Sequence, residues 1–219
     1  MGAATNGNGE WRPPRGRHRV PEFVVAENQR QRLLAGAATA MAEHGYAQMS
    51  VAHIIAAAGV SRTTFYKNFD NKIGCVVAAH DAAFARLMAQ VLRACGAERK
   101  WVDKVVAGLD AALEFAAHEP EAARLLVLDA VGAEPVLVSR VITSDEYLVG
   151  LLRAGRDHHP EMGSLPALTE RAMISGAASI VGSRLLAGEA DRLPQLRPQL
   201  AQLILMPYVG AEEARRIAA

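Results

Sequence analysis

Residues 51–69 read VAHIIAAAGVSRTTFYKNF, and this stretch predicts two short helices joined by a tight turn. Apolar residues recur at helical spacing in its first half, namely Val51, Ile54, Ile55 and Ala58. Gly59 then ends the first helix, since glycine accepts the left-handed conformation found at helix C-termini. Val60 fills the corner, and Ser61 caps the second helix with its hydroxyl. Phe65 and Phe69, four residues apart, anchor the second helix inward. Two helices joined in this way form a helix-turn-helix.

The outward face of the second helix carries basic, hydroxyl and amide groups, namely Arg62, Thr63, Thr64, Tyr66, Lys67 and Asn68. Lys72 lies just beyond this face, and the first acid after the turn is Asp70. In DNA-binding proteins the second helix of the motif enters the major groove, where such groups contact bases and phosphates. The alternative is two packed helices in an ordinary all-α core, because a Gly-Val-Ser corner alone is common. The whole stretch favours DNA binding.

Composition sets the fold class. The 219-residue chain is 51% hydrophobic and only 5% aromatic, and strong helix formers dominate it. No long alternating segment predicts a β-strand, so we expect an all-α protein of about nine helices. The expected parts are a disordered basic arm (1–24), a three-helix head with the helix-turn-helix (25–75, motif about 50–69), and a C-terminal helical domain for regulation and dimerisation (76–219).

Charge is divided unevenly along the chain, although the net charge is only +1. Residues 1–80 hold nine Lys and Arg against five Asp and Glu, whereas residues 81–219 hold fifteen against eighteen. The basic half contains the helix-turn-helix, which suits contact with phosphates. The arm before it carries a basic cluster of Arg12, Arg15, Arg17, His18 and Arg19. We interpret the arm as a solvated tail, with a segment that lies along DNA as the alternative.

Other classes of protein find little support in the sequence. Cys75 and Cys95 are the only cysteines, and they suit small buried apolar positions rather than a disulfide framework or a metal site. The N-terminus lacks the apolar core of a signal peptide, and no run approaches ~18 uninterrupted apolar residues. We therefore expect a cytoplasmic protein without a membrane span, a cofactor or a bound metal.

Two predicted helices near the C-terminus, at about 168–188 and 193–208, are apolar almost all round. Such helices are buried on most sides, and we prefer a subunit interface over the core of a monomer. Small residues that permit close helix approach are Gly176, Ala177, Ala178 and Gly182. The remaining helices are expected at about 27–44, 72–95, 101–118, 120–128 and 135–156, with Asp70 as a cap for the second of these.

The stretch from Glu27 to about Leu87 resembles the TetR family of bacterial one-component repressors. The residues that carry the resemblance are His44-Gly45-Tyr46, Ser50, Val51, Ile54, Ala58-Gly59-Val60-Ser61, Thr63-Thr64-Phe65-Tyr66, Phe69 and Asn71-Lys72. The ending Pro207-Tyr208-Val209-Gly210 is similar to the C-termini of actinobacterial members. The chain departs from the family at Ile55, Asn68 and Ile73, where a small residue, a His or Tyr, and an acid are usual.

The resemblance implies a homodimer that binds a palindromic operator in double-stranded DNA and releases it when a small molecule enters the C-terminal domain. The composition of that domain favours a mainly apolar effector. By match to the motif, Arg62, Thr63 and Lys67 would face base edges. Phosphate contacts would come from Ser50, Thr64, Tyr66, Asn68 and Lys72. This division suits the chemistry, since arginine engages guanine through two hydrogen bonds and hydroxyls, amides and lysine commonly contact the DNA backbone.

Two other functions stay open. A helical protein-binding adaptor would use the motif only for packing. A metal-dependent enzyme would use the adjacent His158 and His159, although no His-x-x-x-His pair with a third ligand, nucleophile elbow or phosphate loop supports catalysis. Residues that could line an effector pocket are Trp101, Leu126, Phe115, Tyr147 and Met162, and we assign no ligand contacts among them.

Overall fold

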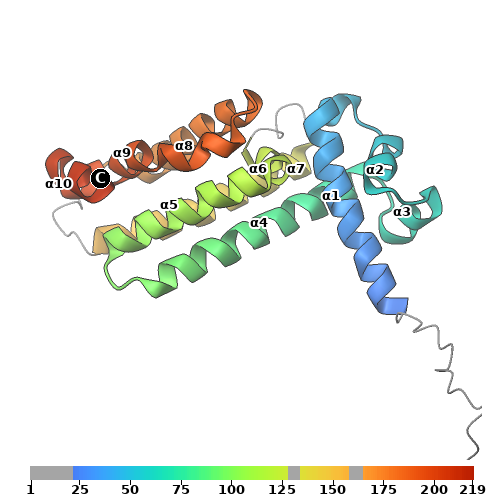
Figure 1. The fold of residues 1–219 in the computed structure, drawn as a ribbon, viewed down its shortest axis with the longest axis horizontal. Helices are drawn as coiled ribbons and strands as arrows, with labels where there is room; N and C mark the ends of the chain where they lie inside the picture. Colours follow the sequence, from blue (N-terminus) through green and yellow to red (C-terminus); the bar gives the residue numbers. More distant parts are fainter. Residues whose placement is uncertain (1–21, 128–133, 158–164) are drawn as a thin grey trace, which may run out of the picture.

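A computed structural model describes residues 22–127, 134–157 and 165–219 of the chain, and over these residues the protein contains helices and no strand. Figure 1 shows a small head of three helices at one end and a bundle of long helices that extends away from it. The all-α prediction is therefore confirmed. Most of the predicted basic arm lies outside the described residues, as do His158, His159 and Met162.

The head consists of α1 (Glu22–Gln48), α2 (Val51–Ala58) and α3 (Arg62–Asn68). The regular part of α1 ends at Gly45, as predicted, because this glycine has a φ of 65°. Ser50 and Ser61 cap α2 and α3 with their side chains, and Gly59 adopts the left-handed conformation at the turn. The head core includes the fully buried side chains of Leu33, Met41, Ile54 and Phe65.

Gly36 fixes the distance between α1 and α2. A Cβ atom at this position would lie 2.7 Å from the backbone nitrogen of Ala58. The two helices therefore pack backbone against backbone, which leaves little room for them to slide. The turn and the second motif helix are thus presented on a rigid support.

The bundle contains the remaining elements: α4 (Lys72–Ala97), α5 (Trp101–His118), α6 (Pro120–Val127), α7 (Pro135–Arg153), the 3₁₀ helix η1 (Ala154–Asp157), α8 (Thr169–Leu186), the 3₁₀ helix η3 (Ala190–Leu196), α9 (Arg197–Val209) and α10 (Ala211–Ala218). Helix α4 belongs to both halves, since it packs against α1 in the head and against α5, α6 and α7 in the bundle. By length and composition α4 could also cross a membrane, but its packing is that of a core helix.

Three details differ from the sequence-based expectations. Asn71, not Asp70, caps α4, because its Oδ1 accepts a hydrogen bond from the backbone N–H of Gly74 at 2.9 Å. The expected helix at 193–208 begins as the 3₁₀ helix η3, and α9 starts at Arg197 so that Pro198 occupies its first turn. A further short helix, α10, follows Gly210 and buries Ala214 and Ala218. The described residues therefore hold ten α-helices rather than about nine.

Candidate DNA-binding surface and effector cavity

Helix α3 turns one face into the head and leaves the other free. Phe65 is fully buried and Phe69 nearly so, while Arg62, Thr63 and Lys67 are exposed and the Tyr66 side chain is 51% exposed. In the described part of the chain none of the exposed basic groups on this helix forms a salt bridge. The surface predicted from the sequence is therefore present, with its charged groups available to a partner.

Other predicted contact residues have roles inside the head as well. The Thr64 hydroxyl lies 2.9 Å from the Ser61 hydroxyl, which also accepts from the Thr64 N–H. The Asn68 amide donates to the Thr64 carbonyl at 2.9 Å. The Ser50 hydroxyl accepts from the backbone of His53. These groups are half-buried or at the start of a helix, so their positions are fixed before any ligand arrives.

Lys72 has internal partners that the sequence did not reveal. Its ammonium donates to the carbonyls of Tyr46 and Met49 at 2.8 and 3.1 Å, and lies 4.0 Å from the centre of the Tyr46 ring. The Tyr46 hydroxyl in turn donates to Glu134 at the start of α7. Burial, together with this carboxylate, raises the pKa of Tyr46, so the phenol stays protonated and continues to donate. Lys72 thus ties α4 to Tyr46 at the C-terminal end of α1 and to Met49, which follows α1.

Two arginines on α1 contact the helix-turn-helix on the side opposite the exposed face of α3. The Arg32 guanidinium donates to the Gly59 carbonyl at 2.7 Å, and the Arg30 guanidinium lies 4.8 Å from the centre of the Phe69 ring. Sequence reasoning missed both, because their partners lie on other helices. A Cβ at position 59 would also meet the Arg32 side chain. Gly59 is favoured by its left-handed backbone conformation, and a side chain there would also displace the Arg32 guanidinium.

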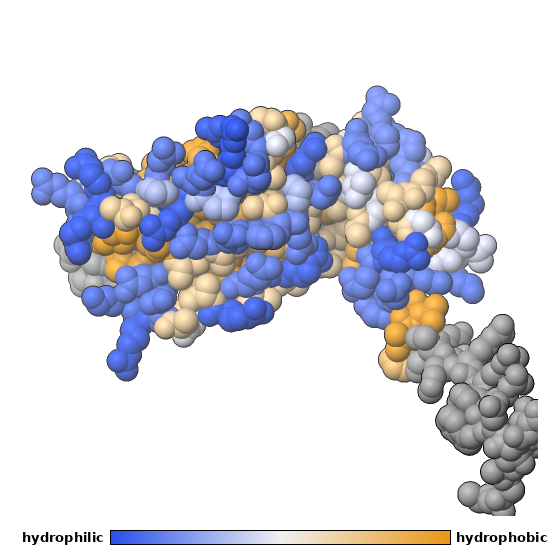
Figure 2. All heavy atoms as spheres, in the orientation of Figure 1, coloured by the Kyte–Doolittle hydropathy of each residue, from blue (hydrophilic) through white to orange (hydrophobic). Residues whose placement is uncertain are grey.

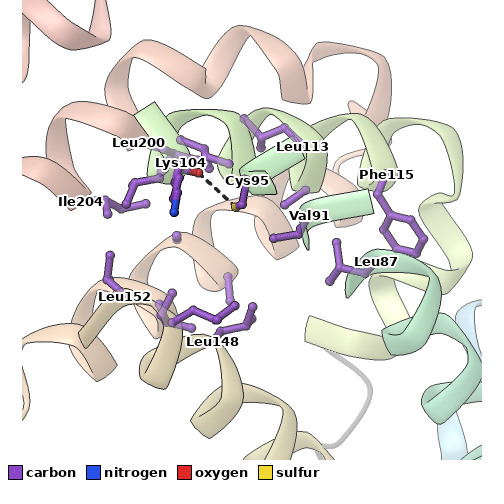
Figure 3. Close-up of a pocket in the computed structure, with 18 of the residues that line it drawn as sticks. Leu87, Val91, Cys95, Lys104, Leu113, Phe115, Leu148, Leu152, Leu200 and Ile204 are labelled. Atoms are coloured by element: carbon purple, nitrogen blue, oxygen red, sulfur yellow. Dashed lines mark hydrogen bonds between the residues drawn. The ribbon is translucent and has the colours of Figure 1, made fainter. Parts of the chain in front are cut away.

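The bundle encloses a cavity of about 570 Å³, within the usual range for small-molecule sites. Its walls come from α4, α5, α6, α7, η1, α8 and α9, with Leu and Val side chains in half of the positions. Figure 3 shows the labelled side chains of Leu148 and Leu152 facing those from the other helices across this space. Of the candidate pocket residues, Trp101, Phe115 and Leu126 line the cavity, whereas Tyr147 does not.

A buried polar network supports the Trp101 end of the cavity. The Trp101 and Tyr208 rings lie 4.7 Å apart, and the Tyr208 hydroxyl donates to Glu170 at 3.0 Å. Glu170 is fully buried and also accepts two hydrogen bonds from the Arg156 guanidinium, at 2.7 and 3.0 Å. This guanidinium holds the pKa of Glu170 below its usual range, so the carboxylate stays ionised. Gly155 leaves room for Trp101, since a Cβ there would lie 2.2 Å from the indole.

Some small and apolar residues of α8 and α9 line the cavity, and others are exposed to solvent. Ala177 and Ala178, which we expected at an interface, line the cavity. Exposed apolar side chains of α8 and α9 are Ile180, Leu186, Leu203 and Met206. Hydrophilic side chains cover most of the face of the bundle seen in Figure 2, with apolar ones between them. The exposed apolar residues of α8 and α9 are thus better candidates for an interface than the small ones.

Comparisons with known proteins agree with this arrangement. Residues 33–79 match the family model of "Bacterial regulatory proteins, tetR family". No curated protein matched the chain in a sequence search. Among solved structures, the fatty acid degradation regulator FadR from Bacillus halodurans has a TM-score of 0.71 at 18% identity, over 83% of this chain and 95% of that one.

Two further structures have similar scores. FadR from Bacillus subtilis, in complex with stearoyl-CoA, has a TM-score of 0.68 at 18% identity, over 82% of this chain and 98% of that one. A TetR-like regulator from Rhodococcus sp. RHA1 has a TM-score of 0.67 at 21% identity, over 88% and 100%. At these identities the likeness shows a shared fold.

Replacement of Lys72 by methionine is expected to destabilise the protein without DNA. The change keeps the length of the side chain but removes both hydrogen bonds to the Tyr46 and Met49 carbonyls, at a cost of about 1–3 kcal/mol. Urea unfolding followed by circular dichroism measures the loss. Lys67→Met is the matched control, since Lys67 is exposed and should leave the midpoint unchanged. Equal midpoints for Lys72→Met and the unmodified protein would show that the internal contacts contribute nothing.

Proposed function

We propose that the chain is a ligand-controlled repressor of the TetR family of bacterial regulatory proteins, whose family model residues 33–79 match. In this proposal it binds a palindromic operator as a homodimer in the cytoplasm, and a small apolar molecule in the bundle cavity releases it. It performs no catalysis. The observation that carries the proposal is the pairing of a rigid, basic α3 surface with a large apolar cavity, joined by one helix.

Operator recognition would use the free face of α3. Arg62, Thr63 and Lys67 are the proposed readers of base edges, because they are exposed and carry hydrogen-bond donors. The proposed phosphate contacts are Ser50, Thr64, Tyr66, Asn68 and Lys72. The Lys72 ammonium has three N–H groups, of which two serve the head, so only the third is free for a phosphate. The internal hydrogen bonds of Thr64 and Asn68 support recognition, since ordered side chains lose little entropy on binding.

Dimerisation would use the outer surfaces of α8 and α9. Leu203 and Met206 on α9 and Ile180 and Leu186 on α8 are between 38% and 63% exposed, which is unfavourable for large apolar side chains in a monomer. A second copy of the chain would cover these side chains. In a dimer with two-fold symmetry, each of the two heads would contact one half of the palindromic operator.

Release would follow from the ligand's preference for one arrangement of the heads. An effector shifts the equilibrium only if it binds the released state more tightly than the DNA-bound state. A typical coupling of ~1–3 kcal/mol would weaken operator binding ~5–150-fold. The Bacillus subtilis regulator of similar fold was solved with stearoyl-CoA. The apolar walls of the present cavity favour a ligand with a long hydrocarbon part.

Replacement of Arg62 or Lys67 by alanine should weaken binding to an operator selected from random DNA. Removing the side chain that reads one base edge costs ~1–3 kcal/mol, and sequence preference relaxes because that edge goes unread. Fluorescence anisotropy measures the affinity for the selected operator and for altered sequences. Affinity that falls as the salt concentration rises would also distinguish a DNA-binding protein from a protein-binding adaptor. Arg93→Ala, on an exposed position of α4 in the bundle, is the control. Unchanged affinity and discrimination in Arg62→Ala would remove Arg62 from the reading surface.

Replacement of Leu203 by glutamate should convert the dimer to a monomer, because the new charge would be buried without a partner in the interface. Sedimentation velocity measures the change. Ile142→Glu on α7 is the control, since Ile142 is also exposed in the single chain but lies outside α8 and α9. A stable dimer for Leu203→Glu and a monomer for Ile142→Glu would move the interface to α7.

Replacement of Ala178 by phenylalanine should fill part of the cavity and weaken ligand binding at least tenfold. Hexadecan-1-ol and shorter alcohols are suitable probes, because each buried methylene contributes ~0.8 kcal/mol, or about fourfold in Kd. Thermal shift and displacement of a fluorescent lipid measure binding. Ala172→Phe, on an exposed position of α8, is the matched control. Undiminished binding by Ala178→Phe would place the ligand elsewhere.

A further inference from the structure

The cavity wall carries one charged side chain. Twenty-six residues line the cavity, and Lys104 on α5 is the single ionisable group among them apart from the Cys95 thiol. The Cys95 thiol donates to the Lys104 carbonyl at 3.2 Å, and burial raises the pKa of the thiol, so Cys95 stays neutral. The ammonium is therefore the one fixed charge that a molecule in the cavity meets.

Lys104 is an exposed residue that contributes to the cavity wall. In Figure 3 its nitrogen lies in the space between α5 and the labelled side chains of Leu152 and Leu148 on α7, with Ile204 of α9 beside it. Across the described residues no carboxylate lies within salt-bridge distance of this nitrogen. Two other cations of the bundle are paired, namely Arg197 with Asp110 and Arg156 with Glu170. Lys104 is thus set apart by both its location and the lack of an acidic partner.

An unpaired ammonium beside apolar walls favours a ligand that brings its own negative charge. A hydrocarbon chain that enters the cavity would cover part of this exposed ammonium and remove water from it, which costs free energy. A neutral ligand of the same length leaves this cost in place, and a cationic ligand adds repulsion between like charges. An anionic group at the Lys104 position gains a charge-assisted hydrogen bond while its chain fills the rest of the cavity.

We infer that the effector is an amphiphile with one long apolar chain and an anionic head, and that Lys104 is the residue which selects the head. This inference rests on the proposed effector function and deepens it. Two kinds of head group supply such a charge: the carboxylate of a fatty acid, and the phosphates in the coenzyme A part of an acyl-CoA. Both place a negative group next to the Lys104 ammonium.

The test compares four hexadecyl probes on the full-length protein, each as a monomer in solution: hexadecanoate, hexadecan-1-ol, hexadecyltrimethylammonium and hexadecanoyl-CoA. Displacement of a fluorescent lipid gives the affinities. We expect at least one anionic probe to bind about tenfold more tightly than the alcohol, as a charge-assisted hydrogen bond supplies, and the cation to bind most weakly. The anion with the larger advantage identifies the source of the charge.

Two variants connect the selectivity to the residue. Lys104→Met should bind the alcohol as before but lose the advantage of the anion, and Lys104→Arg should retain it. Lys100→Met, which removes a lysine at the start of the same helix outside the cavity wall, should behave as the unmodified protein. An alcohol that binds as tightly as both anions, or a Lys104→Met variant with full anion selectivity, would overturn the inference and leave the apolar effector intact. Failure of all four probes to bind would overturn both.

Discussion

The backbone hydrogen bonds of α4 run from Lys72 to Ala97 without a break in helical geometry, and at 1.5 Å per residue the helix is about 39 Å long. Its first turns belong to the core of the head through Cys75 and Val76, and its last turns line the cavity through Val91 and Cys95. Helices bend sharply only at specific defects such as proline, which α4 lacks. In the proposed mechanism, α4 would therefore pass a displacement of the cavity wall on to the head.

The head can respond as one body because its helices are tied at several points. Lys72 holds α4 to the C-terminal end of α1, and Tyr46 at that end donates a hydrogen bond to Glu134 at the start of α7. Arg32 holds the turn before α3 to α1. Within the bundle, Arg86 on α4 pairs with Glu119 between α5 and α6. Motion in the bundle would thus change the angle of the whole head and leave the shape of α3 unaltered.

Sequence reasoning worked best where a residue acts on its own neighbours. Gly59, Ser61 and the pair Phe65 and Phe69 define the motif within one short stretch, so their roles follow from spacing and backbone preference. Asp70 and Asn71 are both favourable N-cap residues. Which of them caps α4 depends on the residue at which the helix begins. Whether a half-apolar helix faces a core, a cavity or a partner also depends on the other helices, as Ala178 illustrates.

The site was predictable to a similar degree. The exposed basic face of α3 follows from the positions of its two buried phenylalanines, whereas the inward contacts of Lys72 depend on carbonyls more than twenty positions away. The residues that line the cavity have the sequence pattern of ordinary core residues. The cavity exists because the side chains of several helices do not fill the space between them, and this depends on how the helices pack. No local pattern marks Lys104 as the one cation on its wall.

The cavity wall includes several of the smallest side chains, among them Gly108, Ala112, Ala123 and Ala177, at positions far from α3. Enlarging any of them shortens or narrows the space, and the reading surface shares none of these residues. In the proposed repressor, a change in the cavity wall would therefore alter which molecule binds without changing the operator, and a change in the head would do the reverse. The same separation makes the chain suitable for conversion into a biosensor, in which the chemical input and the controlled gene are chosen independently.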